Sequence, residues 1–227
     1  MEGAQEKIIT DKGNVVLYSG GEERHERGVA LIIKRKWRSS ILDWSAVSER
    51  LMYARFDSKY INMTVIVAYA PTEQDSEETK EEFYEELEGM FQKCKKHDLK
   101  LIIGDMNAKV GSENDGMKSV MGRHGCGTIN ENGKMLTIFC LKNEMVIGGT
   151  IFPHKDIHKK TWRSPDGRTY NQIDHVMINR PWRRTLADVR AMRGMDVGSD
   201  HYLVIGKLKL KLNTKVMGKM KFWILRN

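Results

Sequence analysis

The chain has 227 residues, enough for one large domain or two small ones, and 40% of them are hydrophobic and 30% charged, a balance typical of folded globular proteins. No run of about 18 apolar residues occurs, which excludes a membrane-spanning helix, and the formal net charge of +8 favours a polyanionic partner. The polar N-terminus lacks an apolar signal-peptide core, and the three widely spaced cysteines match no disulfide framework. We therefore expect an intracellular protein, nuclear or cytoplasmic and not secreted.

Short and nearly continuous apolar runs predict strands that are covered on both faces of a sheet. In chain order they are residues 15–18, 29–33, 63–68, 99–103, 145–147, 173–178, 187–191 and 202–205. Two helices are predicted between them. The first begins near Asp75 or Ser76, where Asp75 and Glu78 resemble a capping box, and the second follows Asn132. Strands and helices interleaved in this way predict an α/β fold.

The C-terminal part of the chain is basic. Leucine and lysine alternate from Lys207 to Leu212, a pattern typical of an edge strand that is protected by charge. A strip of phosphate contacts is the alternative interpretation. No linker or repeat divides the chain, so we expect one domain over residues 1–212, followed by a basic tail or the start of a connector over 213–227.

Polar residues stand at the ends of four predicted strands, where α/β folds build their sites. Tyr69 follows the strand at 63–68, and Asp105 follows the strand at 99–103. Asp174 lies near the start of its strand, and the pair Asp200-His201 comes just before another. Each motif alone is common turn chemistry. Their order, Y-A-P-T, G-D-x-N, I-D-H and S-D-H, is the informative feature.

These motifs, in this order, resemble the endonuclease/exonuclease/phosphatase superfamily. The resemblance is closest to the apurinic-endonuclease-like domains of LINE retrotransposons, in particular those of RTE-type elements and their domesticated relatives, the craniofacial development protein 2-like proteins. The matching motifs run from about Tyr18 to Leu212 and include Gly104 to Gly111, Asn130 to Gly133 and Thr161-Trp162. It implies a four-layer α/β sandwich of two packed β-sheets flanked by helices, and metal-dependent hydrolysis of phosphodiester bonds in DNA.

The resemblance also implies a role for each motif residue. Asp105 would orient and deprotonate the attacking water, while Asn107 and Tyr69 would contact the scissile phosphate. Asp174 would orient His201 against the phosphoryl oxygens. Asp200 would help to hold a divalent cation. Carboxylate oxygens are hard ligands, which suit Mg²⁺ or Mn²⁺. Such a cation offsets the charge that develops on the phosphate. No small-molecule cofactor and no membrane partner are expected.

Basic, polar and aromatic residues in the last third of the chain are candidate contacts to DNA. They are Arg168, Asn171, Trp182, Arg183 and Arg184. Arginines can bind the phosphate backbone, and a tryptophan can stack or wedge between bases. For the tryptophan and its neighbouring arginines, the alternative is a solvated loop before a strand.

Intact domains of this kind begin with a strand that ends in an asparagine and a second strand that ends in a metal-binding glutamate. The similarity here starts at about Lys7, and no apolar strand precedes Gln5-Glu6. We therefore expect the first one or two strands to be absent, together with that asparagine and glutamate. Their loss would weaken Mg²⁺ binding, impair activity and leave sheet edges for a protein partner or a longer polypeptide to cover.

Two alternatives to an active endonuclease remain. One is a catalytically inactive module that binds nucleic acid or protein. The other is a phosphatase of the same superfamily.

Overall fold

The structure is a computed structural model that describes residues 4–20, 28–193, 198–210 and 220–224. Its strands are β1 (Ala4–Ile9), β2 (Val15–Gly20), β3 (Gly28–Ile33), β4 (Ile41–Ser48), β5 (Leu51–Phe56), β6 (Met63–Tyr69), β7 (Leu99–Asp105), β8 (Met145–Ile147), β9 (Trp162–Arg163), β10 (Tyr170–Asn171), β11 (Asp174–Asn179), β12 (Leu186–Met192), β13 (Leu203–Leu208) and β14 (Met220–Ile224). The α-helices are α1 (Glu77–Lys93) and α2 (Glu131–Lys142), and short 3-10 helices are η1 (Arg35–Ser40), η2 (Gly148–Thr150), η3 (Asp156–His158) and η4 (Arg180–Thr185).

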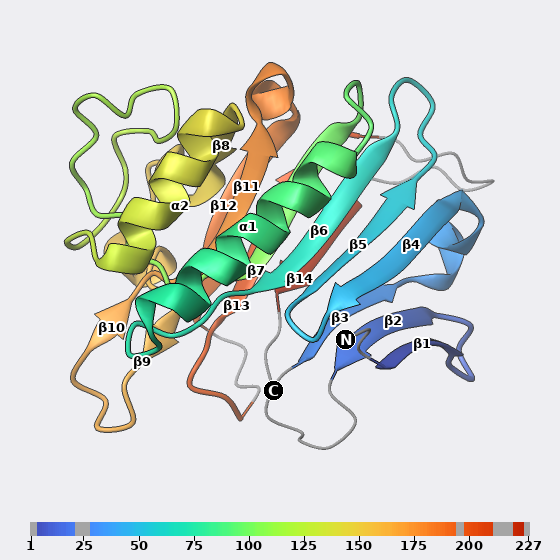
Figure 1. Ribbon diagram of the computed structural model, residues 1–227, viewed down its shortest axis with the longest axis horizontal. Coiled ribbons are helices and arrows are strands. Elements are labelled where there is room, and N and C mark those ends of the chain that lie inside the picture. The colour runs from blue at the N-terminus through green and yellow to red at the C-terminus, as the bar shows by residue number, and fades with distance from the viewer. Residues whose placement is uncertain (1–3, 21–27, 194–197, 211–219, 225–227) are drawn as a thin grey trace.

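A six-stranded sheet forms the centre of the molecule, in the order β4-β5-β6-β7-β11-β8. The pair β6–β7 is parallel and the other neighbouring pairs are antiparallel. Both α-helices lie on one face of this sheet (Figure 1). Side chains alternate along β7, so Ile102 packs under the helices while Leu101 and Ile103 pack on the opposite face. The continuous apolar runs of the sequence therefore reflect a sheet that is covered on both sides.

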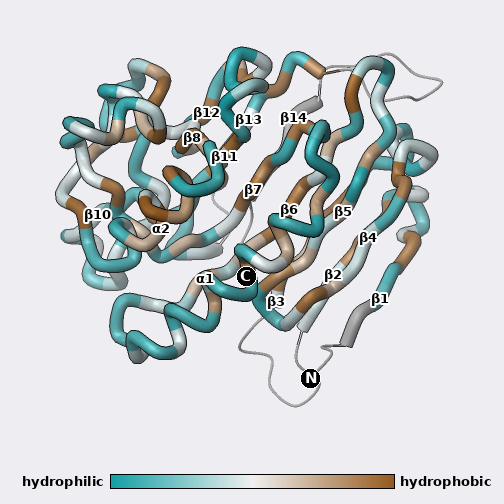
Figure 2. Tube along the Cα trace, turned by 45° about the horizontal axis from the view of Figure 1, so that its top comes forward, coloured by the Kyte–Doolittle hydropathy of each residue, from teal (hydrophilic) through white to brown (hydrophobic). Residues whose placement is uncertain are grey.

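Two three-stranded sheets, β1-β2-β3 and β12-β13-β14, form the next layer. Leu17 of the first and Val204 of the second belong to the same buried cluster as Leu101, so both sheets pack against the central sheet. Figure 2 shows the apolar residues concentrated along the central strands. The predicted α/β class with packed sheets and outer helices is confirmed.

Every predicted strand is present, and further strands occur where the sequence lacks a long apolar run. β4 and β5 were not predicted. β4 is only partly covered, and β5 is mostly buried but interrupts its apolar residues with Arg55. β1 occupies the polar start of the chain, and its Glu6 is exposed. β13 lies between β12 and β14, so the edge-strand prediction is wrong for Lys207 and Leu208, while residues 211–212 lie outside the described residues. β14 falls within 213–227, so part of the predicted tail belongs to a sheet.

Side chains cap both helices. Ser76 Oγ accepts a hydrogen bond from Thr79 N at 3.2 Å at the start of α1. Asn130 Oδ1 accepts one from Gly133 N at 2.8 Å, so α2 begins before Asn132 and not after it. None of the described helices is both long enough and apolar enough to cross a membrane.

Candidate active site

Segments that are far apart in the sequence meet at one end of the central sheet. Asp105 ends β7 and lies directly opposite Asp174, which starts the antiparallel strand β11. Tyr69 ends β6 beside Asp105 in the parallel pair. His201 comes from the segment before β13, where a backbone bridge joins it to Trp162. We call the end of the sandwich where Asp105, Asp174 and His201 meet the site end.

Asp174 and His201 form a buried pair. The side chains are 2% and 5% exposed, and His201 Nδ1 lies 3.0 Å from Asp174 Oδ2 and 3.2 Å from Oδ1. Burial alone would lower the pKa of His201, but the hydrogen bond to Asp174 and the charges of Asp174, Asp105 and Asp200 outweigh it, so the pKa is raised. The carboxylate of Asp174 accepts from Nδ1, which leaves Nε2 as the nitrogen that faces the rest of the site.

Two further carboxylates lie around Nε2 of His201. Asp105 is buried, and its Oδ2 lies 3.9 Å from Nε2, which is beyond hydrogen-bonding distance. Asp200 Oδ1 lies 4.0 Å from the same nitrogen, and its side chain is 53% exposed. The Trp162 indole donates to Asp200 Oδ2 at 2.7 Å and so fixes the orientation of this exposed carboxylate.

The chemistry of these donors fits a hard divalent cation. Ligand atoms of Asp105, Asp174 and His201 lie within 4.8 Å of one another. Asp174 is engaged by His201 Nδ1 at 3.0 Å, which leaves Asp105 as the other carboxylate of this group. Asp200 is outside the group, but its Oδ1 lies 4.0 Å from His201 Nε2, and carboxylate oxygens are the ligands that cations such as Mg²⁺ prefer.

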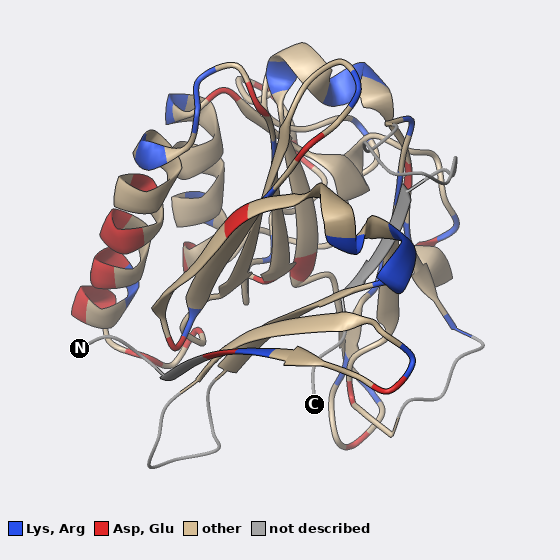
Figure 3. Ribbon diagram, turned by 90° about the vertical axis from the view of Figure 1, so that its right-hand side faces the viewer, with Lys and Arg blue, Asp and Glu red and all other residues tan. Residues whose placement is uncertain are grey.

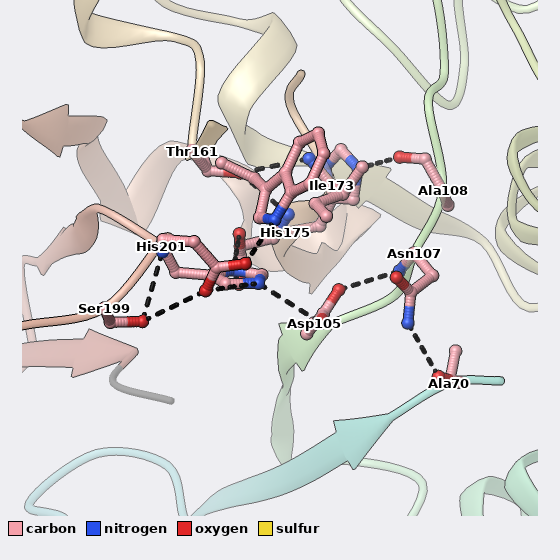
Figure 4. Close-up of polar contacts among 12 residues, drawn as sticks. Ala70, Asp105, Asn107, Ala108, Thr161, Ile173, His175, Ser199 and His201 are labelled. Atoms are coloured by element: carbon pink, nitrogen blue, oxygen red, sulfur yellow. Dashed lines mark hydrogen bonds and ion pairs between the residues drawn. The ribbon is translucent and has the colours of Figure 1, made fainter. Parts of the chain in front are cut away.

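The loop after β7 places Asn107 beside Asp105 (Figure 4). Asn107 has φ of 47°, a left-handed conformation that asparagine tolerates better than most residues. Its backbone N donates to Asp105 Oδ1 at 2.9 Å, and its side-chain Nδ2 donates to Ala70 O at 2.9 Å. Asn107 thus orients the Asp105 carboxylate and ties the loop after β7 to the loop after β6.

The start of α2 supports this loop, and the sequence analysis assigned it no role. Asn132 is 1% exposed, and its Nδ2 donates to Asn107 O at 3.2 Å and to Pro71 O at 3.0 Å. Asn130 Nδ2 donates to Glu73 Oε2 at 2.6 Å. At Gly133 an added Cβ would lie 1.9 Å from a backbone oxygen, so only glycine fits there. The N-E-N-G motif quoted for the family resemblance was the available signal.

Thr161 and His175 hold the other side of the site. Thr161 Oγ1 accepts hydrogen bonds from Ile173 N at 3.0 Å and Asp174 N at 3.1 Å, which fixes the start of β11. Burial lowers the pKa of His175, and its Nε2 lies 2.7 Å from Ala108 O, to which it must donate. His175 is a buried strand residue, as the sequence predicted, and it also anchors the loop that carries Asn107.

Tyr69 is half-buried and lies against Arg50. The Arg50 guanidinium carbon lies 4.9 Å from the centroid of the Tyr69 ring, and Arg50 Nη1 donates to Tyr69 O at 3.2 Å. This cation beside Tyr69 was not singled out from the sequence. It places positive charge at the end of β6, where an anionic group would meet Tyr69.

The predicted DNA contacts fall in two different places. Asn171 pairs with Trp162 in the β9–β10 hairpin, and Arg168 is exposed on the loop of that hairpin, so both lie at the site end. Trp182, Arg183 and Arg184 lie on η4, after β11. Because β11 runs away from Asp174, about 17 Å of strand separates η4 from the Asp–His pair. The structure therefore does not bring these three residues to the site.

Comparison with known proteins finds close relatives. The chain is 39% identical over 204 residues to craniofacial development protein 2 of Bos taurus, and 38% identical to the protein of the same name from Tragulus javanicus. Each alignment covers 90% of this chain, but 34% and 35% of the two relatives. The chain thus spans about a third of the length of the curated relatives it matches. No family model matches it.

Solved structures share the fold at low sequence identity. The endonuclease domain of TRAS1, a telomere-specific non-LTR retrotransposon, has a TM-score of 0.59 and 14% identity, covering 86% of this chain and 79% of that one. An AP endonuclease from Archaeoglobus fulgidus has a TM-score of 0.60 and 20% identity over 87% and 80%. The 3' phosphatase NExo from Neisseria, bound to a product DNA hairpin, has a TM-score of 0.60 and 17% identity over 86% and 79%.

Proposed function

The chain is a homologue of craniofacial development protein 2 and has the endonuclease/exonuclease/phosphatase fold, and from this premise we propose that it is a metal-dependent DNA endonuclease of retrotransposon origin. The observation that carries the proposal is the environment of His201. Asp174 holds its Nδ1, while its Nε2 faces the carboxylates of Asp105 and Asp200 at 3.9 and 4.0 Å. The chain spans about a third of the length of this relative. What the whole protein does is therefore a proposal as well.

The residues of the site divide the work of hydrolysing a phosphodiester. Asp105 accepts the proton of the attacking water, since its carboxylate is held in one orientation by the backbone N of Asn107. His201 donates from Nε2 to a phosphoryl oxygen, and the hydrogen bond from its Nδ1 to Asp174 raises its pKa and so favours the charged form. Tyr69 and the second amide hydrogen of Asn107 contact the same phosphate. A divalent cation held by Asp105 and Asp200, Mg²⁺ or Mn²⁺, would offset the negative charge of the phosphate.

DNA is the proposed substrate because several observations agree on it. The net charge of +8 favours a polyanion. Arg168 is exposed on the loop of the β9–β10 hairpin, whose strand β9 is bridged to His201 through Trp162. The structural neighbours include a retrotransposon endonuclease domain and an AP endonuclease, and also a 3' phosphatase bound to a product DNA hairpin. A nuclear or cytoplasmic location would follow from this substrate.

A plasmid-nicking assay tests the proposal. The purified chain is incubated with supercoiled plasmid and Mg²⁺ or Mn²⁺, and open-circular product is measured. We expect nicking that EDTA abolishes and that Asp105→Asn reduces by about 10³-fold, the scale of lost general-base catalysis. Lys118→Gln is the matched control, because this exposed side chain lies on the loop after β7 and pairs only with Asp115 among the described residues.

The alternatives predict different results. A catalytically inactive binding module would bind DNA but would not nick the plasmid with either metal. A phosphatase would release phosphate from a 3'-phosphorylated oligonucleotide and leave the plasmid supercoiled. Either result would contradict the endonuclease proposal.

A further inference from the structure

Four segments build the end of the sandwich opposite the site end. They are η1, the turn 57–62 between β5 and β6, the loop 94–98 before β7, and η4 after β11. They lie at this end because β4, β6 and β7 start here, while β5 and β11 finish here. From β4 to β11 the sheet crosses four strand spacings, so the row of segments is about 19 Å long.

Hydrogen bonds join these segments to one another. Asp57 N donates to Ser40 O at 2.7 Å, which places the turn 57–62 beside the end of η1. Asn179 Nδ2 donates to Asp98 O at 3.1 Å, which places η4 beside the loop before β7. These hydrogen bonds place neighbouring segments of the row side by side.

Exposed cations line this surface. We call them together the basic end: Lys34, Arg35, Lys36, Arg38, Lys59, Lys95, Lys96, Arg183 and Arg184. In Figure 3 Lys and Arg gather along the top and over η1, whereas the acidic residues of α1 lie toward its other end. Of the carboxylates at this end, Asp98 pairs with Arg55 and Glu144 with Arg180, which are cations outside this set, while Asp57 lies in the turn itself. The nine exposed cations of the basic end outnumber these three carboxylates, so the surface carries a net positive charge.

An aromatic ring stands among these cations. Tyr60 is 76% exposed, more than any other exposed large hydrophobic side chain of the described residues. Lys59 Nζ lies 5.2 Å from the centroid of its ring. Proteins that bind single strands of nucleic acid combine a basic track for the backbone with aromatic rings on which bases stack. A duplex keeps the faces of its bases covered, so an exposed ring favours a single strand.

We propose that the basic end binds a single strand of nucleic acid, with phosphates on its cations and a base stacked on Tyr60. This surface lies about 17 Å from the Asp–His pair, which is the length of β11. A nucleic-acid strand bound there is therefore separate from the phosphodiester bond that would be hydrolysed at the site end. The chain would then hold one strand at one end and act on another strand at the other. A solvated face that binds nothing is the competing explanation of the same charges.

Fluorescence anisotropy of a labelled oligo-dT strand of about 20 nucleotides tests the proposal, in EDTA and at several salt concentrations. The variant Arg38→Gln, Lys59→Gln, Arg183→Gln removes three cations along the row. The control variant Lys7→Gln, Lys118→Gln, Lys134→Gln removes three exposed cations elsewhere. We expect the first variant to raise Kd by about tenfold or more and to reduce the slope of log K against log salt by about 2, whereas the control changes little.

Tyr60→Leu isolates the stacking contact. We expect it to raise Kd for the single strand by about fivefold or more and to leave Kd for a duplex of the same length unchanged. Asp105→Asn should bind the strand as tightly as the wild type, which separates this result from the endonuclease proposal. Equal affinity and equal salt slope for the two triple variants would overturn the proposal, as would a Tyr60→Leu chain that binds the single strand normally.

Discussion

Two buried aspartates stand at opposite ends of the same strand, β7, and they have different surroundings. Asp98, just before the strand, accepts hydrogen bonds from Arg55 at 2.7 and 3.1 Å and from Thr64 at 2.8 Å. Asp105, the last residue of the strand, has Asn107 N as a hydrogen-bond donor at 2.9 Å to Oδ1, and its Oδ2 lies 3.9 Å from His201 Nε2. Burial is nearly the same, at 3% and 4% exposure.

The difference separates a structural carboxylate from a candidate catalytic one. Burial alone would raise the pKa of Asp98, but the Arg55 and Thr64 hydrogen bonds and the charges of Arg55 and Lys100 outweigh it and lower the pKa. Such a group is fixed as an anion and stabilises the fold. Asp105 faces an imidazole across a distance that a water molecule or phosphate oxygen can bridge. Geometry around the buried charge, more than burial itself, therefore distinguishes the two ends.

Removing His201 should have the largest effect. We expect His201→Gln to lower kcat for nicking by about 10³-fold, because the variant has no cationic donor beside the phosphate. Initial rates at saturating plasmid measure the effect, and far-ultraviolet circular dichroism checks the fold. If the variant kept more than a tenth of the wild-type rate, His201 would not take part in the chemical step.

Asn132 should affect activity without touching substrate. Asn132→Ala removes the donor that braces both Asn107 O and Pro71 O, and a shift of about 1 Å at Asn107 costs about 100-fold in kcat. Ser112→Ala, an exposed loop residue, serves as the control. If Asn132 only supports folding, the variant would lose stability while its kcat per folded molecule stays at the wild-type value, and this result would contradict the positioning role.

Asp98 should show the opposite behaviour. We expect Asp98→Asn to lower the free energy of unfolding by about 2 kcal/mol, since charged hydrogen bonds to Arg55 are lost, and to leave kcat unchanged. Urea unfolding and the nicking assay measure the two quantities. Loss of kcat in the folded variant would show that the two ends are not independent.

The pH dependence of the Asp98–Arg55 ion pair should be the smallest effect. The pKa of Asp98 is lower in the folded chain than its ordinary value of 3.8, so its contribution is present above about pH 4 and is lost as the pH falls through the lowered value. The difference in unfolding free energy between wild type and Asp98→Asn should be constant from pH 7 to 5 and shrink below about pH 4. Urea titrations at pH 7, 5 and 3.5 check this. If the difference in unfolding free energy grew as the pH fell, the pKa of Asp98 would be raised by folding and not lowered, which would contradict the prediction.

The sequence predicted the site end better than the opposite end, for physical reasons. Asp105 and Asp174 stand at recognisable ends of apolar strands, and the family resemblance assigned both to one site. The antiparallel pairing of β7 and β11 places them opposite each other. Asn132 and Thr161 act through backbone hydrogen bonds, which leave no periodicity in a sequence. Trp182 to Arg184 were predicted only as contacts to DNA, because their distance from the site depends on the direction of β11 relative to β7, and no local pattern encodes that direction.

The most direct test of the difference between the two ends compares Asp105→Asn with Asp98→Asn in parallel, with kcat for nicking and the free energy of unfolding measured on the same preparations. We predict that Asp105→Asn loses about 10³-fold in kcat with little loss of stability, and that Asp98→Asn loses about 2 kcal/mol of stability with kcat unchanged. The opposite pattern, or equal loss of both quantities in both variants, would contradict the assignment of the site.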